Sequence, residues 1–559
     1  MANSFIKGFA QGMTSRRSRT SSRYSPSASA YDVKQFVVRH AVRNMDTNYK
    51  GDKYALTLPF DDKNEPLYKH QKEAIRAILN EPHILLNIFA RGGKTRIVLE
   101  AIKLLKKQGK PYKTVVVCYN EVSISEWATQ CAKYVPDLRV GFITSINKEK
   151  RIEQARAFDG DIFLTTYGQL FSILSQLVRT RNRKGKTVRK FMLFDDEYVQ
   201  SFATKFNIAV FDESREICSP NSSTFRMCTV LAYKKSKIIL MSATPFSNDP
   251  SPLWSQGYVM DLGETFGPTF FGFQRLFYTK KSVPFGSGVV CAFNRKYSSY
   301  IGKLFKNVAL TYDSTEVGAD FPPVSTSFIG VPMGLGAHSR SYLSAKNKFI
   351  VDIQKVSKVN RVLKLQLVKS VYSASRQICS GFIYMDNKNG SGEPIRFFPI
   401  PKMDETVNLV KEIHGHSKVV VFFWFKESGR QLQKEMDKIK VPYVSMFGGE
   451  NGTESYKRFQ NDPNCRVLLA NSEVGGVGFN LSVADYIIFY EPPNSFYNYY
   501  QATQRILVPG KKRPVFIYNL FTKNTVEERI YASFREGRDF WGEVMQKNMD
   551  IEDQILGDA

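Results

Sequence analysis

The sequence has few of the features that mark disulfide-bonded, zinc-binding or membrane-spanning proteins. No two cysteines form a C-x-x-C pair, and the six histidines do not cluster with them. The seven cysteines are Cys118, Cys131, Cys218, Cys228, Cys291, Cys379 and Cys465. We therefore expect reduced thiols, a cytosol-like compartment and no structural zinc. Because no run of about 18 apolar residues occurs, we also expect no transmembrane helix.

Acidic residues are scarce as well, and their scarcity bears on the partner. The 559 residues include 79 Lys and Arg against 52 Asp and Glu, a formal net charge of +27. This surplus favours a polyanion, either nucleic acid or an anionic membrane surface, and does not choose between them. The length exceeds one hydrophobic core, and 43% hydrophobic residues indicate a mostly globular chain of two or more domains.

Two segments are basic and poor in apolar residues. Residues 1–31 contain no acidic residue and are rich in Ser and Arg. They cannot bury enough apolar surface to offset their ordering entropy, so we expect a flexible basic tail over residues 1–50. The same composition suits an organelle transit peptide, and that alternative stays open. A second basic run, residues 179–190, is either a solvated loop, a nucleic-acid contact or a targeting signal.

Strand and helix patterns alternate in two stretches of the chain. Two-sided apolar strands that alternate with helices are typical of a parallel sheet flanked by helices. The expected helices and strands are helices 70–79 and 96–106, strands 84–88, 114–118, 161–165, 208–211 and 238–241, and later strands 419–424, 467–470, 486–490 and 515–520. The sequence thus predicts an α/β fold with a first lobe over 51–261, an irregular or helical region over 262–400, a second lobe over 401–535 and a C-terminal tail over 536–559.

A glycine-rich turn follows the first predicted strand. Arg91-Gly92-Gly93-Lys94-Thr95 opens a helix, so backbone N–H groups and a helix N-terminus would face phosphate. Lys94 would reach the β- and γ-phosphates, and the Thr95 hydroxyl would ligate Mg²⁺. The full phosphate-loop pattern begins with Gly, whereas this chain has Ile88 there.

Two further strand ends carry polar residues that fit the same chemistry. Asp212 and Glu213 follow the strand 208–211, as a metal-holding carboxylate and a water-activating general base would. Ser242 and Thr244 follow the strand 238–241 and could couple to the γ-phosphate through hydrogen bonds to the acidic pair.

Together these motifs resemble superfamily 2 helicases, and among them the Swi/Snf-type double-stranded DNA translocases, over residues 65–535. The resemblance implies that Gln71 contacts adenine and that Thr165 and Thr166 lie along a nucleic-acid strand. The resemblance adds Asn471 and Ser472 as nucleic-acid contacts, Gly476 and Gly478 at the nucleotide, and Gln501 with an arginine finger, Arg505. The motif Thr525-Val526-Glu527-Glu528 would end the second lobe.

The resemblance also implies two RecA-like lobes with an ATP cleft between them, ATP and Mg²⁺ as cofactors, and double-stranded DNA as the favoured partner. Protein partners are not indicated. The expected function is a nucleic-acid-stimulated ATPase that translocates on DNA, and whether it also unwinds or remodels the DNA stays open. Because no reader segment is recognisable, we expect a viral or phage role in replication, recombination or transcription, in the host cytoplasm or nucleus.

Two departures from the family pattern keep other functions open. Val508 stands where relatives carry a second arginine, and Arg91 stands where many helicases carry a further Gly. Arg513 or Arg91 could compensate for the missing arginine. One alternative is therefore an ATPase-weak DNA clamp or assembly protein with a helicase fold. The other is an RNA helicase or transcription-release factor.

Overall fold

The structure is a computed structural model. It describes residues 29–60, 65–145, 147–181, 187–193, 196–246, 249–282, 289–317, 320–348, 350–352, 362–364, 368–384, 394–447, 452–472 and 479–537. The chain divides into two compact units: the first comprises residues 1–280 and 291–318, and the second residues 281–290 and 319–559. Within the described ranges, no helix combines the length and the hydropathy needed to cross a lipid bilayer.

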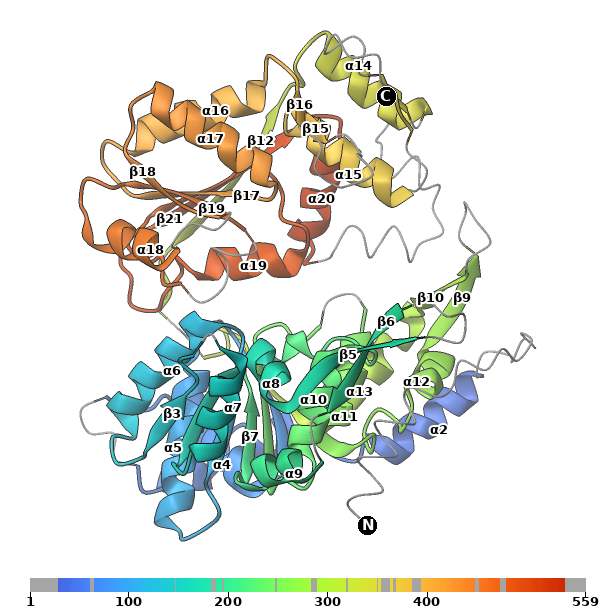
Figure 1. The fold of residues 1–559 in the computed structure, drawn as a ribbon, viewed down its shortest axis with the longest axis vertical. Helices are drawn as coiled ribbons and strands as arrows, with labels where there is room; N and C mark the ends of the chain where they lie inside the picture. Colours follow the sequence, from blue (N-terminus) through green and yellow to red (C-terminus); the bar gives the residue numbers. More distant parts are fainter. Residues whose placement is uncertain are drawn as a thin grey trace. The chain divides into compact units, whose positions relative to one another are not determined.

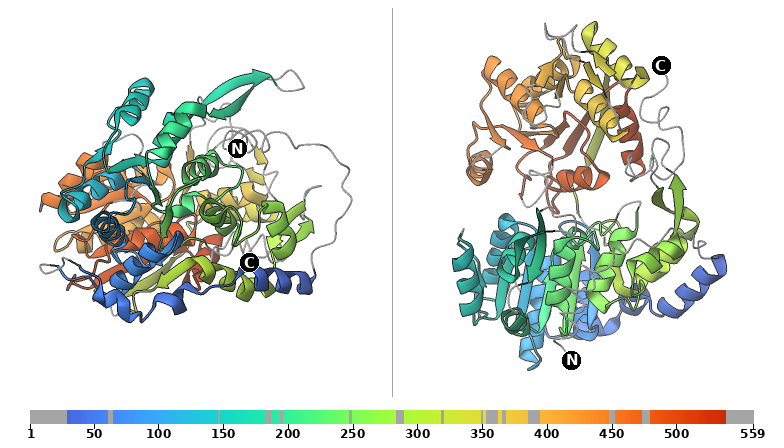
Figure 2. Two further views of the ribbon diagram at one scale, coloured as in Figure 1. Left: turned by 90° about the horizontal axis from the view of Figure 1, so that it is seen from below. Right: turned by 45° about the vertical axis from the view of Figure 1, so that its right-hand side comes forward.

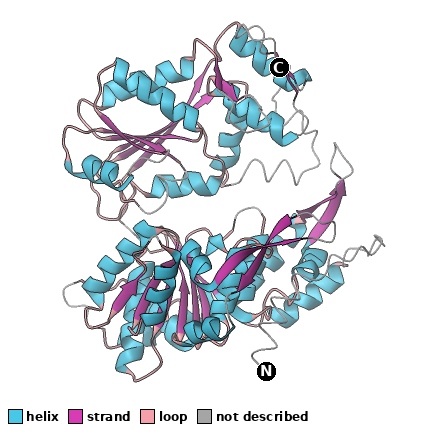
Figure 3. Ribbon diagram, in the orientation of Figure 1, coloured by secondary structure: helices cyan, strands magenta, loops and turns pink. Residues whose placement is uncertain are grey.

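The first unit is built on a seven-stranded parallel sheet with the order β11-β1-β8-β7-β2-β4-β3. Its strands are β1 (His83–Ile88), β2 (Thr114–Cys118), β3 (Val140–Phe142), β4 (Ile162–Thr166), β7 (Ile208–Phe211), β8 (Lys237–Ser242) and β11 (Ala309–Tyr312). Every residue of β2, β4 and β7 is buried, because helices cover both faces of the sheet (Figures 1 and 3). The five strands predicted for this lobe are confirmed to within a residue at either end.

Helices and short 3-10 turns surround this sheet. They are α2 (Ala30–His40), α3 (Met45–Tyr49), η1 (Lys53–Thr57), α4 (Lys69–Asn80), α5 (Lys94–Lys107), α6 (Glu121–Tyr134), α7 (Lys148–Ala157), α8 (Tyr167–Leu174), α9 (Asp196–Thr204), η2 (Ser214–Glu216), α10 (Ser223–Ala232), α11 (Ser251–Asp261), α12 (Phe270–Phe277), η3 (Arg295–Tyr297) and α13 (Ser298–Val308). Both predicted helices of this lobe, now α4 and α5, are confirmed.

The predicted N-terminal tail is wrong over residues 29–50. Ser29 begins α2 with a capping box, and Val33 and Val37 on that helix are buried in the core of the first unit. The Ser- and Arg-rich composition ends where α2 begins, so the chain regains enough apolar surface to pack. Residues 1–28 lie outside the described residues.

The second unit is built on a six-stranded parallel sheet with the order β12-β21-β20-β17-β19-β18. Its strands are β12 (Val324–Val331), β17 (Val419–Phe423), β18 (Tyr443–Met446), β19 (Val467–Asn471), β20 (Tyr486–Phe489) and β21 (Val515–Thr522). Its helices are α14 (Ala337–Lys348), α15 (Val368–Cys379), α16 (Pro401–Ile413), α17 (Lys426–Lys438), α18 (Gly452–Asn461), α19 (Phe496–Gln504) and α20 (Val526–Arg535). Two units that each carry a parallel sheet flanked by helices confirm the predicted α/β class.

The region expected to be irregular or helical, residues 262–400, contributes a strand to each sheet. Strand β11 pairs with β1 in the first unit, and β12 pairs with β21 in the second. Most residues of β12 are exposed or half-buried, as an edge strand allows. The expectation of a purely irregular or helical region was therefore wrong, because edge strands need not be apolar on both faces.

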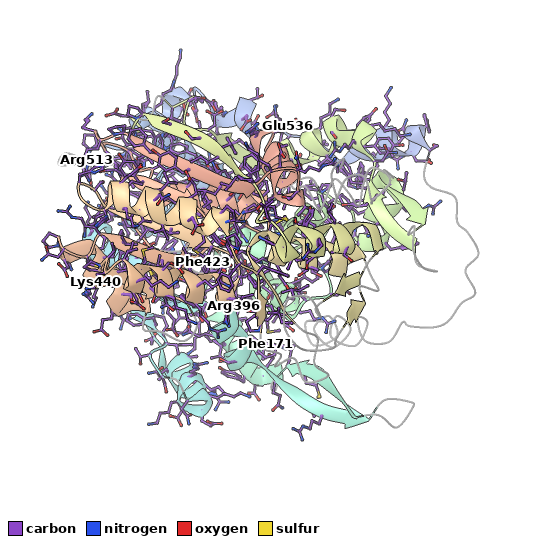
Figure 4. All side chains as sticks on the ribbon, turned by 90° about the horizontal axis from the view of Figure 1, so that it is seen from above. Phe171, Arg396, Phe423, Lys440, Arg513 and Glu536 are labelled. Atoms are coloured by element: carbon purple, nitrogen blue, oxygen red, sulfur yellow. The ribbon has the colours of Figure 1, made fainter. Side chains whose placement is uncertain are left out.

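Among the described residues, four small two-stranded sheets accompany the two large ones. They are β5 (Ser175–Arg181) with β6 (Thr187–Leu193), β9 (Tyr278–Ser282) with β10 (Val289–Phe293), β13 (Ile350–Asp352) with β14 (Val362–Lys364), and β15 (Phe382–Tyr384) with β16 (Pro394–Arg396). Residues 179–181 and 187–190 of the basic run lie on the antiparallel arms β5 and β6, so the loop interpretation is wrong for them, and residues 182–186 lie outside the described residues. These arms project from the helices of the first unit (Figure 2, left), and Phe171 of α8 lies near their base (Figure 4).

Candidate functional site

The predicted phosphate loop joins β1 to α5. Gly93 has the left-handed φ of 82°, and a Cβ at Gly93 would lie 2.1 Å from Gln71 Nε2. At Gly92 a Cβ would lie 2.5 Å from a methyl carbon of Ile88. The left-handed φ therefore favours glycine at Gly93, and a side chain at Gly92 would force the packed Ile88 and Phe89 side chains to shift. No side chain caps α5 at Gly93. The N-terminus of a helix attracts anions, so this end of α5 suits a phosphate.

Lys94 folds back over the same loop. Its Nζ donates hydrogen bonds to the carbonyl oxygens of Ile88 (2.9 Å) and Phe89 (3.3 Å). Thr95 follows it in the first turn of α5, half-buried. An ammonium, a hydroxyl and the uncapped amides of a helix are the donor set that suits a triphosphate with Mg²⁺, so the residues fit the expected cofactor.

Helix α4 supports the loop from beneath through two adjacent side chains. Gln71 accepts a hydrogen bond from the Tyr68 amide (3.0 Å) and donates to the Gly92 carbonyl (3.3 Å). His70 Nε2 lies 3.0 Å from the same carbonyl. Burial lowers the pKa of His70, so the neutral ring donates from Nε2. His70 was not predicted as a site residue; its position beside Gln71 was the only available signal.

A cavity of about 350 Å³ lies beside this part of α4. It is lined by Lys50, Gly51, Tyr68, Lys69, His70, Glu73, Tyr312, Glu316 and Val317. Gln71 itself is 4% exposed and faces the phosphate loop. Its predicted contact with adenine stays a prediction.

Asp212 and Glu213 follow β7, at the sheet edge where the loop after β1 also lies. Asp212 Oδ2 accepts a hydrogen bond from Trp127 Nε1 (2.9 Å), and Oδ1 accepts one from the Glu213 amide (3.0 Å). Glu213 adopts the left-handed φ of 46°. Because parallel strands end at a common edge, the sheet order β1-β8-β7 brings the acids to the side of the phosphate loop.

Ser242 and Thr244 follow β8, which lies between β1 and β7. The buried Ser242 hydroxyl accepts a hydrogen bond from the Thr244 amide (3.1 Å). Thr244 Oγ1 is buried and has no hydrogen-bond partner among the described residues. A hydroxyl in this state is available to a ligand or to the acidic pair, so the predicted coupling role stays a prediction.

Thr165 and Thr166 end β4 and face the protein interior. Thr165 is fully buried, and Thr166 is 8% exposed. The Thr166 hydroxyl accepts a hydrogen bond from the Gln169 amide (3.0 Å) and caps α8. Neither hydroxyl lies on the surface, so a nucleic-acid contact here would involve the backbone or a change of conformation.

The predicted site residues of the second unit include two side-chain atoms, on Gln501 and Ser472, that are buried without a hydrogen-bond partner among the described residues. Arg505 donates to Gln501 Oε1 (3.4 Å), and Asn471 donates to the Trp424 carbonyl (2.7 Å). Gln501 Nε2 and Ser472 Oγ are buried without a hydrogen-bond partner among the described residues. An unsatisfied buried polar group costs about 1–3 kcal/mol, which a bound ligand would recover. Gly476 and Gly478 lie outside the described residues.

The two departures from the family pattern are Val508, in the second unit, and Arg91, in the phosphate loop. Val508 is half-buried four residues after Gln504, the last residue of α19. Arg513 Nε lies 3.3 Å from Asp485 Oδ1, with 64% of the arginine side chain exposed. Arg513 thus forms an exposed ion pair with Asp485, and its compensation for the missing arginine stays a prediction.

Comparison with known families decides the assignment. Residues 91–381 match the model for the SNF2-related domain, and residues 401–508 match the helicase conserved C-terminal domain. The chain belongs to the SNF2-related family. The resemblance inferred from the motifs is thereby confirmed, and the two units carry the domains of a helicase-type ATPase.

Curated proteins that match most of this chain have low sequence identity to it. DNA repair and recombination protein RAD26 of Saccharomyces cerevisiae is 22% identical over 481 residues, which are 78% of this chain and 43% of that protein. Human DNA excision repair protein ERCC-6 is 22% identical over 75% of this chain and 27% of its own length. An uncharacterized ATP-dependent helicase of Mycoplasma genitalium is 22% identical over 87% of this chain and 44% of its length. The chain spans less than half the length of these curated relatives.

Among solved structures, the SWI2/SNF2 ATPase core of Sulfolobus solfataricus in complex with double-stranded DNA is similar. It is 18% identical, the match covers 88% of this chain and 94% of that one, and the TM-score is 0.36.

Proposed function

We propose that the protein is a DNA-dependent ATPase that uses hydrolysis to translocate on duplex DNA. The observation that carries this is the loop at Gly92-Gly93-Lys94, which opens an uncapped helix on the same sheet edge as Asp212 and Glu213. Membership in the SNF2-related family and the net charge of +27 support a DNA partner. The names of two relatives, a DNA repair and recombination protein and a DNA excision repair protein, also support a DNA partner.

The residues divide the chemistry among them. Lys94 and the first turn of α5 bind the phosphates of ATP, and Thr95 and Asp212 hold Mg²⁺, which neutralises charge on the transferring group when bound. Glu213 takes the proton of the attacking water. Arg505, oriented by Gln501, is the cation that meets the charge developing on the γ-phosphate.

Strand separation and a viral or phage setting are finer hypotheses. Both stay predictions. A reducing, cytosol-like compartment is proposed from the cysteines, since all seven are free.

Phosphate release by the purified full chain tests the proposal. It is measured without polymer and with duplex DNA, single-stranded DNA or RNA, beside Lys94→Ala. The matched control is Lys107→Ala, which removes an exposed lysine from the last turn of the same helix. Turnover that is highest with duplex DNA and lost only in Lys94→Ala supports the proposal.

Two other outcomes would favour the alternative functions. Lys94-dependent turnover that is highest with RNA would indicate an RNA helicase or transcription-release factor. Tight DNA binding without any Lys94-dependent turnover would indicate a clamp, as Val508 in place of the second arginine could produce.

A further inference from the structure

Two buried tryptophans of the first unit make hydrogen bonds of the same length to different acceptors. Trp127, 2% exposed, donates from Nε1 to the carboxylate oxygen Oδ2 of Asp212 at 2.9 Å. Trp254, 3% exposed, donates from Nε1 to the backbone carbonyl of Gly267 at 2.9 Å. The two indoles are alike in burial and in hydrogen-bond length. They differ mainly in the acceptor, which is a carboxylate for Trp127 and a backbone carbonyl for Trp254.

The indole of Trp127 holds the side chain of a residue whose backbone is already fixed. The backbone amide of Asp212 donates to the Val117 carbonyl of β2 (2.9 Å). The backbone carbonyl of Asp212 accepts a hydrogen bond from the Tyr167 hydroxyl (2.9 Å). The carboxylate is set separately, with Oδ1 on the Glu213 amide (3.0 Å) and Oδ2 on Trp127. Trp127 thus supplies a hydrogen bond that orients the second carboxylate oxygen.

The sheet explains how a residue 85 positions away reaches Asp212. Strand β2 lies next to β7, and α6 begins three residues after β2 ends. Trp127 lies in the second turn of α6, close to the end of β7, and carries its ring to the carboxylate.

We propose that Trp127 is a positioning residue for the Mg²⁺ that accompanies ATP. This rests on the proposed function of the site. An indole N–H is a donor without charge, so it orients the carboxylate without neutralising its negative charge. A lysine or arginine in the same place would neutralise that charge. Each carboxylate oxygen has further lone pairs, so the bond to Trp127 does not occupy the oxygen.

The test compares Trp127→Phe with Trp254→Phe, its matched control, in the full chain. Phosphate release with duplex DNA is measured while Mg²⁺ is titrated at saturating ATP. Loss of a residue that orients a metal ligand costs about 10- to 100-fold in metal affinity or activity. We expect the half-saturating Mg²⁺ of Trp127→Phe to rise at least about 10-fold, with kcat recovering at high Mg²⁺. Trp254→Phe should keep the wild-type half-saturation.

Three results would overturn the proposal. They are an equal shift in both variants, a fall in kcat of Trp127→Phe at unchanged Mg²⁺ half-saturation, and a wild-type Mg²⁺ dependence in Trp127→Phe. Absence of Lys94-dependent turnover in the wild type would instead contradict the proposed function, because no Mg²⁺ dependence would then be measurable.

A second measurement applies if Trp127→Phe does not fold. The chain has four tryptophans, so replacing Trp254, Trp424 and Trp541 with Phe leaves Trp127 alone. Its emission is followed while Mg²⁺ is added to the ADP-bound protein. A change that is absent in the same protein carrying Asp212→Asn supports the proposal. No change with Mg²⁺, or the same change with Asp212→Asn, contradicts it.

Discussion

Lys402 and Glu527 form an ion pair inside the second unit. Lys402 Nζ donates to both carboxylate oxygens of Glu527, at 2.6 and 2.8 Å, and the two side chains are 2% and 1% exposed. Glu527 also accepts a hydrogen bond from the Thr522 amide (2.9 Å). The motif at residues 525–528 therefore ties α20 to α16 and to the end of β21, which is a structural role.

Removing the lysine should destabilise the second unit strongly. Lys402→Met leaves a buried carboxylate without its cation, and breaking a buried pair from one side costs about 3–5 kcal/mol. The double variant Lys402→Met/Glu527→Gln removes the unpaired charge and should recover part of the lost unfolding free energy. Free energies of unfolding from denaturant titration measure both. The control is Lys438→Met, whose partner Glu435 lies on the surface, where a pair contributes about 0–1 kcal/mol. Equal losses at the two sites would contradict the prediction.

The basic arms β5 and β6 should contact nucleic-acid phosphates. Arg179 and Arg189 are paired across the arms, and the run 179–190 contains no acidic residue. Arg179→Gln/Arg189→Gln should weaken duplex binding and reduce the slope of log affinity against log salt by up to about 0.9 per lost contact. Binding is measured over a range of salt concentrations. Lys106→Gln/Lys107→Gln, at the exposed end of α5, removes the same charge and should leave the slope unchanged. A slope that falls equally in both pairs would point to net charge alone.

The sequence predicted those parts of the fold that depend on local pattern. Strands β2, β7 and β19 are buried at every residue, so their two-sided apolar pattern was recognisable. Edge strands were missed because their pairing depends on distant chain: β11 pairs with β1 across more than 200 residues. Helix α2 was missed because the flexible tail inferred from the basic residues 1–31 was assumed to continue to residue 50.

The candidate site was predicted to a similar extent. Loops that present backbone to phosphate need glycine, so Gly92 and Gly93 were identified from residue type alone. The support beneath them was not, because the bonds from His70 to Gly92 and from Trp127 to Asp212 join residues 22 and 85 positions apart. Such contacts are set by the sheet order, which the sequence does not display.

His70 should make the first unit sensitive to acid. Burial lowers the pKa of His70 below its ordinary value of 6.5, so the unfolded chain binds this proton more readily than the folded one. The stability that neutral His70 contributes is present above pH 6.5 and is lost as the pH falls toward the folded pKa. His70→Phe keeps the ring packing but removes the proton, so its unfolding free energy should fall less than that of the wild type between pH 7.5 and about pH 5.5.

The difference in unfolding free energy between His70→Phe and the wild type, followed against pH, isolates the titration of His70, because the other titrating groups are common to both proteins. His416→Phe, which makes the same replacement at an exposed histidine of the second unit, is measured over the same pH range as the control. At pH 7.5 the hydrogen bond to the Gly92 carbonyl is also lost in His70→Phe, at about 0.5–1.5 kcal/mol. Parallel pH profiles of the wild type and His70→Phe would contradict the prediction.

Arg91 should contribute to ATP binding at a cost in backbone strain. It adopts the left-handed φ of 68° in the phosphate loop, a conformation that favours glycine. Arg91→Gly relieves about 1–2 kcal/mol of strain, and the added freedom of the unfolded chain offsets much of it, so stability should change by less than about 1 kcal/mol. If the guanidinium contacts phosphate as predicted, the KM for ATP should rise about 10-fold, the loss of roughly 1.4 kcal/mol of binding.

Lys234 provides the matched control for this change. It is an exposed cation with a left-handed φ of 60°, outside the phosphate loop. Lys234→Gly therefore makes the same backbone change and the same charge change without affecting a phosphate contact. Unfolding free energies and ATP kinetics are measured for both variants. A higher KM only in Arg91→Gly identifies Arg91 as a phosphate ligand, and a kcat loss with it would assign Arg91 the work of the arginine absent at Val508. Unchanged kinetics in both variants would show that Arg91 adds strain to the loop and nothing to catalysis.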